Sequence, residues 1–237
     1  MDIFQTLVPN LFMGLRLTIL VAVVGIAFGF VIGCIAGYAL QSKSKVARVI
    51  AFIYIWIVRG TPIIVQALYV YYVVPALLSS GGNNFNMDST VAGIIVISIN
   101  SGAFITEIVR GALQSVDEGQ KEAGRSLGMS NGQVLLHIII PPAFRQMLPA
   151  LFNQFIISLK DTSMLTIIVV NEMTQQAMNY ATTTFDYVGG YTMLAAFYLV
   201  LISILMVLQK VIERKLNVKK PPKPKLKQFK EATAVVS

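Results

Sequence analysis

The chain has 237 residues, of which 55% are hydrophobic and 13% are charged. Soluble domains carry roughly 25% charged residues, so this composition excludes an ordinary soluble globule. The formal net charge is +8, and the basic excess lies in a C-terminal Lys/Pro tail, which is typical of a cytoplasmic end near anionic lipid and not of a nucleic-acid-binding surface.

The first apolar segment, residues 11–40, predicts a transmembrane helix. It carries no charged residue beyond position 16, and a run of about 20 apolar residues is enough to cross the hydrocarbon core. Four of its glycines recur at a spacing of four and form one stripe, which lets two helices pack closely. These helix-packing glycines are Gly25, Gly29, Gly33 and Gly37.

The second apolar region, residues 46–78, is too long for one straight crossing at about 1.5 Å per residue. It is interrupted by Arg59-Gly60-Thr61-Pro62, in which the proline lacks an amide donor and the glycine permits unusual dihedral angles. We therefore expect an interfacial or broken first part and a second span that starts near residue 63. The polar loop 79–90 that follows contains no Lys or Arg.

Three further spans are predicted at residues 91–110, 149–170 and 191–211. Lys and Arg fall in alternate connections, and basic residues prefer the cytoplasmic side, so the N-terminus is expected outside and the C-terminus inside. The predicted fold is an all-α membrane protein of about five transmembrane helices. Residues 1–216 would form one transmembrane domain, with a cytoplasmic loop at about 111–145, and residues 217–237 a disordered tail.

The polar connection before the fourth span predicts a helical hairpin. Gly128 is placed to end one helix in a left-handed conformation, and Ser130 with Gln133 forms a capping-box pair that starts the next helix. The stretch 119–126 nearly fits a phosphate-binding loop, but Arg125 stands where that loop requires lysine. The chain also leaves no room for an α/β nucleotide-binding domain, so we expect it to bind no cofactor and to have no enzymatic activity.

Four polar residues lie at the middle of the fourth predicted span: Lys160, Asp161, Thr162 and Ser163. An ionised group at that depth costs roughly 2.5–3.5 kcal/mol on insertion scales, so such groups face a bundle interior or a wet cavity. Two interpretations remain open at this point. The cluster either pairs with other spans and braces the fold, or it lines a substrate path together with Asn100, which lies at similar depth in the third span.

The hairpin segment resembles the cytoplasmic EAA loop of ABC importer permeases. Glu122-Ala123-Gly124, then Gly128, then Ile138 to Pro141 reproduce its spacing, with Gly124 in place of the second alanine and Ile140 in place of leucine. Arg59-Gly60-Thr61-Pro62, Glu107-Ile108-Val109-Arg110-Gly111 and Leu159-Lys160-Asp161-Thr162-Ser163 look like motifs of the polar amino acid branch of that family.

The resemblance implies a type I importer fold and a channel-forming permease subunit in a bacterial inner membrane. It implies coupling to two cytoplasmic ATPase subunits, which hold ATP-Mg, through Glu122, Ala123, Gly124, Gly128 and Pro141. It also implies an identical or a different permease partner, surrounding membrane lipid, and a separate extracytoplasmic protein that delivers the amino acid.

A self-contained secondary transporter or channel is the main alternative. It would usually show an inverted repeat, and five unequal spans do not divide into matching halves. A membrane anchor, the third reading, does not explain polar residues at mid-span. The sequence does not identify the amino acid.

Overall fold

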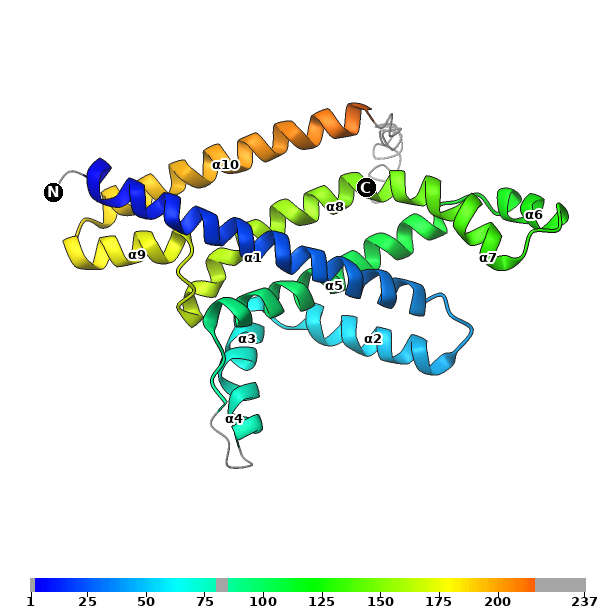
Figure 1. Cartoon of the computed structure of the whole chain (residues 1–237), viewed down its shortest axis with the longest axis horizontal. Coiled ribbons are helices and arrows are strands. Elements are labelled where there is room, and N and C mark those ends of the chain that lie inside the picture. The colour runs from blue at the N-terminus through cyan, green and yellow to red at the C-terminus, as the bar shows by residue number, and fades with distance from the viewer. Residues whose placement is uncertain (1–2, 80–84, 216–237) are drawn as a thin grey trace, which may run out of the picture.

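The computed structural model describes residues 3–79 and 85–215, and within these ranges every regular element is helical (Figure 1). The elements before the hairpin are α1 (Ile3–Ala39), α2 (Lys45–Gly60), α3 (Ile63–Leu68), a π-helical turn η1 (Tyr69–Val73), α4 (Val74–Ser79) and α5 (Ser89–Gln114). They are followed by α6 (Glu118–Ser126), α7 (Asn131–Gln133), a π-helical turn η2 (Val134–Ile139), α8 (Ile140–Asp161), a 3₁₀ turn η3 (Thr162–Ile168), α9 (Met173–Thr184) and α10 (Tyr187–Lys215).

The described residues contain four helical runs long and apolar enough to cross a membrane, and one bent pair that makes a fifth candidate span. The four runs are Ile3–Ala39, Ser89–Gln114, Asn131–Ile168 and Tyr187–Lys215. The prediction of about five membrane helices is confirmed. The first and third of these runs start well before the predicted positions 11 and 149, because hydrophobicity in the sequence marks only their most apolar parts. The predicted tail, residues 217–237, lies outside the described residues.

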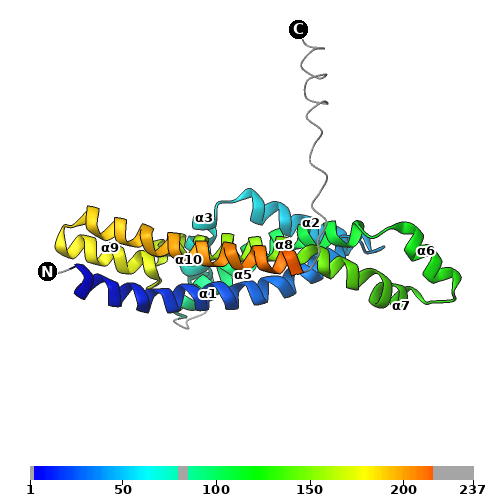
Figure 2. The same ribbon diagram turned by 90° about the horizontal axis from the view of Figure 1, so that it is seen from above.

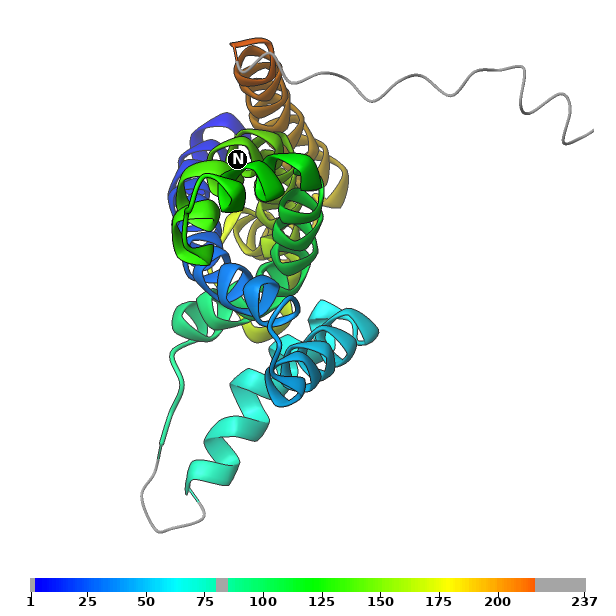
Figure 3. The ribbon, with the colours of Figure 1, turned by 90° about the vertical axis from the view of Figure 1, so that its right-hand side faces the viewer.

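The bent pair is Lys45–Gly60 with Ile63–Ser79, and the chain bends by 107° between the two parts. Thr61 at the break is extended, with φ −122° and ψ 141°, because a following proline disfavours helical backbone. Figure 3, seen from the end that carries α6, shows the α3–α4 segment extending sideways from the other helices. The break therefore occurs at the Arg59–Pro62 motif, where the sequence predicts an interruption.

The glycine stripe of α1 faces α5 at very short range. A Cβ atom added to Gly25 would lie 2.6 Å from Ile97 Cγ2, and one added to Gly33 would lie 2.5 Å from Ile105 Cγ2. At Gly37 the nearest atom would be Val109 Cγ1, at 2.9 Å. Side chains of ordinary size would not fit along this line without a shift of α5.

One end of the elongated bundle holds α9 and the other holds α6 and α7 (Figures 1 and 2). The segment between the predicted spans 149–170 and 191–211 contains the helix α9 (Met173–Thr184), which packs against the first half of α1 and against α10. Glu172 caps this helix, since its side chain accepts a hydrogen bond from the Gln175 amide. Leu7, Leu11 and Ala177 are fully buried in that contact.

Candidate coupling hairpin and substrate path

The hairpin between α5 and α8 is held by backbone and capping hydrogen bonds. Asp117 caps α6 by accepting from the Gly119 amide at 2.7 Å. Gly128 then turns the chain in the left-handed region, with φ 80°, and glycine is the residue that adopts this conformation without strain. Ser130 and Gln133 form the predicted capping box, in which each side chain accepts from the backbone amide of the other.

Gly124 is the buried residue of α6 and the contact point between the two arms of the hairpin. An added Cβ would collide with Ile138 Cδ1 and would lie 3.2 Å from Val134 Cγ2. The glycine that replaces the usual alanine of the motif is therefore matched by a larger side chain opposite. Pro141 stands at the junction of η2 and α8, where its missing amide proton and the π-helical turn both depart from the regular helical hydrogen-bond pattern.

The outer face of α6 is exposed. Glu122 and Ala123 are exposed, and Leu127 beside the turn is 83% exposed. The hairpin projects beyond the transmembrane helices at the end of the bundle opposite α9 (Figure 1). A stiff projection with an apolar tip and a charged flank is suited to insertion into a groove on another protein. Leu127 was not singled out from the sequence, although an apolar residue directly before the turn glycine is a usable signal.

The Lys160–Ser163 cluster lies where α8 passes into η3. Thr162 is fully buried and donates from its hydroxyl to the Leu159 carbonyl at 2.8 Å. Ser163 likewise donates to the Lys160 carbonyl at 2.7 Å. Both hydroxyls thus satisfy carbonyls of the last helical turn, whereas Lys160 is exposed and Asp161 is half-buried. Within the described residues, the two charged side chains make no hydrogen bond or ion pair, whereas each hydroxyl has already donated its proton.

Asn100 is engaged at the helix break. Its side-chain amide donates to Gln66 Oε1 at 3.1 Å. Gln66 in turn donates from Nε2 to the carbonyl of Val58 at 2.7 Å and to that of Thr61 at 3.0 Å. These carbonyls lose their helical partners at the break, so Gln66 replaces hydrogen bonds that water cannot supply inside a membrane. Gln66 was missed from the sequence, although it is the one polar residue of α3.

Glu172 is a second buried polar residue that links several elements and that the sequence did not reveal. It is fully buried and joins three elements, since Oε1 accepts from Thr166 of η3 at 3.1 Å and from the α9 amide of Gln175 at 3.0 Å. Its Oε2 accepts from the Tyr198 hydroxyl of α10 at 3.2 Å. Burial raises the pKa of Glu172 above its usual range. The only hint in the sequence is an acidic residue in a connection that lacks Lys and Arg.

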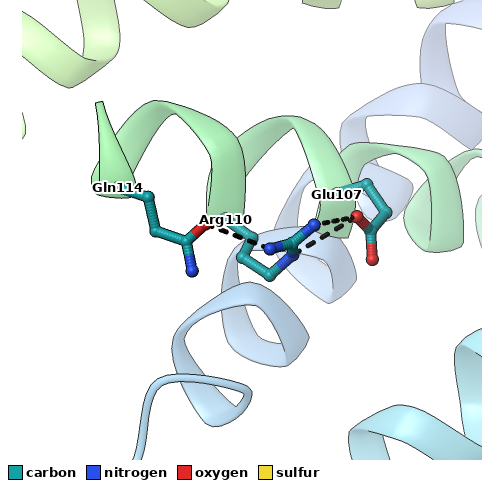
Figure 4. Close-up of polar contacts among 3 residues, drawn as sticks. All are labelled: Glu107, Arg110 and Gln114. Carbon is teal, nitrogen blue, oxygen red and sulfur yellow. Dashed lines mark hydrogen bonds and ion pairs between the residues drawn. The ribbon is translucent and has the colours of Figure 1, made fainter.

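A third polar group lies on α5 near its end. Arg110 donates from Nη2 to Glu107 Oε2 at 2.7 Å and from Nη1 to Gln114 Oε1 at 3.0 Å (Figure 4). Arg59 of α2 lies over the Phe104 ring, with its guanidinium carbon 5.4 Å from the ring centroid. Within the described ranges, no three His, Cys, Asp or Glu side chains are grouped so that they could hold a metal ion.

Comparisons with known proteins agree with this arrangement. Residues 29–218 match the family model described as binding-protein-dependent transport system inner membrane component. The glutamine transport system permease protein GlnP of Escherichia coli strain K12 is 37% identical over 211 residues, covering 89% of this chain and 94% of that protein. The arginine transport system permease protein ArtQ of Bacillus subtilis strain 168 is 31% identical, with the same coverage of 89% and 94%.

Solved structures give the same picture. A crystal structure of an amino acid ABC transporter with histidines contains a chain that is 34% identical and superposes with a TM-score of 0.80, covering 88% of this chain and 94% of that one. An inward-facing MetNI methionine ABC transporter has a TM-score of 0.71 at 20% identity, which shows a shared fold.

Proposed function

The chain belongs to the family of binding-protein-dependent transport system inner membrane components, and on that premise we propose that it is the channel-forming permease subunit of an ATP-driven importer of polar amino acids. Relatives that cover most of the chain are permease proteins for glutamine and arginine. The chain is a multi-pass inner-membrane protein with the type I importer permease fold, and it is not itself an enzyme. Its substrate belongs to the polar amino acid class.

The observation that carries this proposal is the projecting hairpin α6–α7. Its turn at Gly128, its capping box and its exposed outer face make a preformed docking element at one end of the bundle. A secondary transporter has no use for such an element, because its energy comes from an ion gradient through the same chain. Glu122, Ala123, Gly124, Gly128 and Pro141 are the residues that we assign to contact with an ATPase subunit.

The remaining partners follow from the same proposal. Permeases of this family work with a second permease subunit, ATPase subunits and an extracytoplasmic binding protein. ATP-Mg would be held by two ATPase subunits and not by this chain. The hairpin end would face the cytoplasm, with the N-terminus outside and the C-terminus inside, which places Lys43, Lys45 and Arg48 on the cytoplasmic side as basic residues prefer.

We assign the substrate path to the region around Lys160 and Asp161. A zwitterionic amino acid brings one carboxylate and one ammonium group, and these two side chains offer one partner for each. Thr162, Ser163 and Asn100 support the path indirectly, since their polar groups are bonded within the chain.

Reconstitution of the complete complex tests the proposal. The chain should copurify with ATPase and permease subunits after mild detergent extraction. Proteoliposomes that contain this complex should take up labelled glutamine or arginine only with ATP and binding protein present. Asp161→Asn should lower uptake and change the preference among amino acids while assembly with the ATPase stays normal. Thr162→Val is the variant matched to Asp161→Asn. It removes a hydroxyl that is bonded within the chain and so tests for a local structural role. ATP-independent uptake by the chain alone would refute the importer proposal.

A further inference from the structure

Parts of two sequence motifs line one pocket between α2 and α5, namely Arg59 and Gly60 of residues 59–62 and Glu107 and Arg110 of residues 107–111. The pocket has a volume of about 700 Å³, inside the roughly 300–1,000 Å³ range of small-molecule sites. Its lining includes Trp56, Arg59, Gly60, Glu107, Arg110 and Gln114. The α2 residues that line it come from the last nine residues of that helix, and the α5 residues come from the last eight residues of α5, at the end that leads to α6.

Some polar groups of the pocket already have hydrogen-bond partners, and others do not. Arg110 bonds to Glu107 through Nε and Nη2 and to Gln114 through Nη1, so its donors point along α5 (Figure 4). Among the described residues, the Arg59 guanidinium has no hydrogen-bonded or ion-paired partner, and its Phe104 contact is a stacking contact that leaves the N–H groups free. Glu107 Oε1 and the Gln114 amide NH₂ also lack partners there. One cation, one anionic oxygen and one neutral donor therefore remain for a ligand.

The depth of Arg59 argues for a wet pocket. Phe104 lies ten residues before the end of α5, which is about 15 Å along the helix axis. The headgroup region on each side of a bilayer is only about 5–8 Å thick, so a lipid phosphate at its usual level lies short of Arg59. A charged group at that depth faces a water-filled cavity or a counter-ion.

The glycines of both motifs leave space and are not required by helix packing. A Cβ atom added to Gly60 or to Gly111 would meet no atom within 4 Å. The glycines of the α1 stripe behave in the opposite way, since each one abuts α5. Gly60 therefore keeps the wall beside Arg59 open.

We propose that this pocket is a second amino acid site, nearer the hairpin end than Lys160, in which Arg59 binds the α-carboxylate of the substrate. The free oxygen of Glu107 takes the α-ammonium group, and the Gln114 amide donates to a polar side chain. An amino acid offers a carboxylate to Arg59 and an ammonium group to the Glu107 oxygen that Arg110 leaves unbonded, whereas a phosphodiester has no donor for that oxygen. The inference rests on the proposed import function. It assigns the pocket to a later step on the same substrate path, after the region around Lys160 and Asp161.

Thiol labelling inside the pocket tests the inference. Gly60→Cys in a Cys34→Ala background places the chain's one thiol beside Arg59. The labelling rate is measured on the complete complex with and without L-glutamine or L-arginine. Ligand at ten times its Kd should slow labelling about tenfold. The decarboxylated counterparts, 4-aminobutanamide and agmatine, should have no effect. Added Arg59→Gln should abolish protection, and Arg48→Gln, an exposed change on the same helix, should leave it intact.

The outcomes separate the site from the import function. If wild-type proteoliposomes import glutamine or arginine but neither amino acid slows labelling, the pocket is not a substrate site. Equal protection by the decarboxylated counterparts overturns the role of the carboxylate, and protection by phosphatidylglycerol alone assigns the pocket to a lipid headgroup. Absence of import by the wild-type complex refutes the proposed function instead. If Gly60→Cys prevents assembly, Phe52→Cys takes its place, because Phe52 lines the pocket and has no role in the proposed binding.

Discussion

Gly33→Ala should destabilise the permease because its new methyl group has no room against α5. The added Cβ would lie 2.5 Å from Ile105 Cγ2 and 2.7 Å from Ile105 Cβ, and the branched side chain has few alternative rotamers. Overpacking of this kind costs about 1–3 kcal/mol. Alanine regains about 1 kcal/mol of helix propensity over glycine, so the net loss should be about 0–2 kcal/mol.

Gly111→Ala on α5 is the matched control, since a Cβ there meets no atom within 4 Å. This control gains the higher helix propensity of alanine and has no overpacking cost. The two variants should therefore differ by about 1–3 kcal/mol in unfolding free energy. The assay is unfolding of the purified permease in mixed micelles with increasing SDS, followed by the fluorescence of Trp56, the only tryptophan. Equal stability of the two variants would refute the close approach of α1 to α5.

Three other changes test separate parts of the structure. Gly128→Asp should abolish transport and substrate-stimulated ATP hydrolysis while membrane insertion persists, because a side chain at φ 80° costs about 1–2 kcal/mol and adds charge at the docking turn; wild-type uptake would contradict this. Gln66→Leu should lower the thermal unfolding midpoint, since two carbonyls at the break lose their donor; an unchanged midpoint would show that the break needs no such support. Because burial raises the pKa of Glu172, native stability should fall as pH rises through that raised value. Glu172→Gln should flatten the dependence of unfolding on pH above the ordinary pKa of glutamate, and an equally steep profile in the variant would exclude Glu172 as its source.

The helix count and the hairpin were predictable because local chemistry determines them. Apolar runs of membrane length, the proline at position 62 and the Ser130–Gln133 pair each act within a few residues of themselves. The helix α9 was not predictable in the same way. Its cap is a glutamate in place of the usual Ser, Thr, Asp or Asn, and much of its stability comes from distant residues of α1 and α10.

The candidate substrate path shows where sequence reasoning is limited. Depth along a span follows from counting residues, so the sequence alone predicts that Asn100 and Lys160 are intramembrane polar groups. The partner of a polar group depends on which helices touch. Asn100 bonds to Gln66, which is 34 positions away in the chain, and no local pattern connects the two. Glu172 is similar, because its bond to Tyr198 bridges 26 positions.

The run from Asn131 to Ile168 is one continuous helical rod that starts in the hairpin and ends at the polar cluster. From Ser130 to Lys160 it measures about 45 Å along its axis. A push on the hairpin therefore reaches Lys160 as a tilt or a shift of the whole rod, unless the rod flexes at a weak point. Its weak points are the π-helical turn η2 and Pro149, where the regular hydrogen-bond pattern is disturbed. A Pro149→Ala substitution would stiffen the rod and make its two ends move more nearly as one.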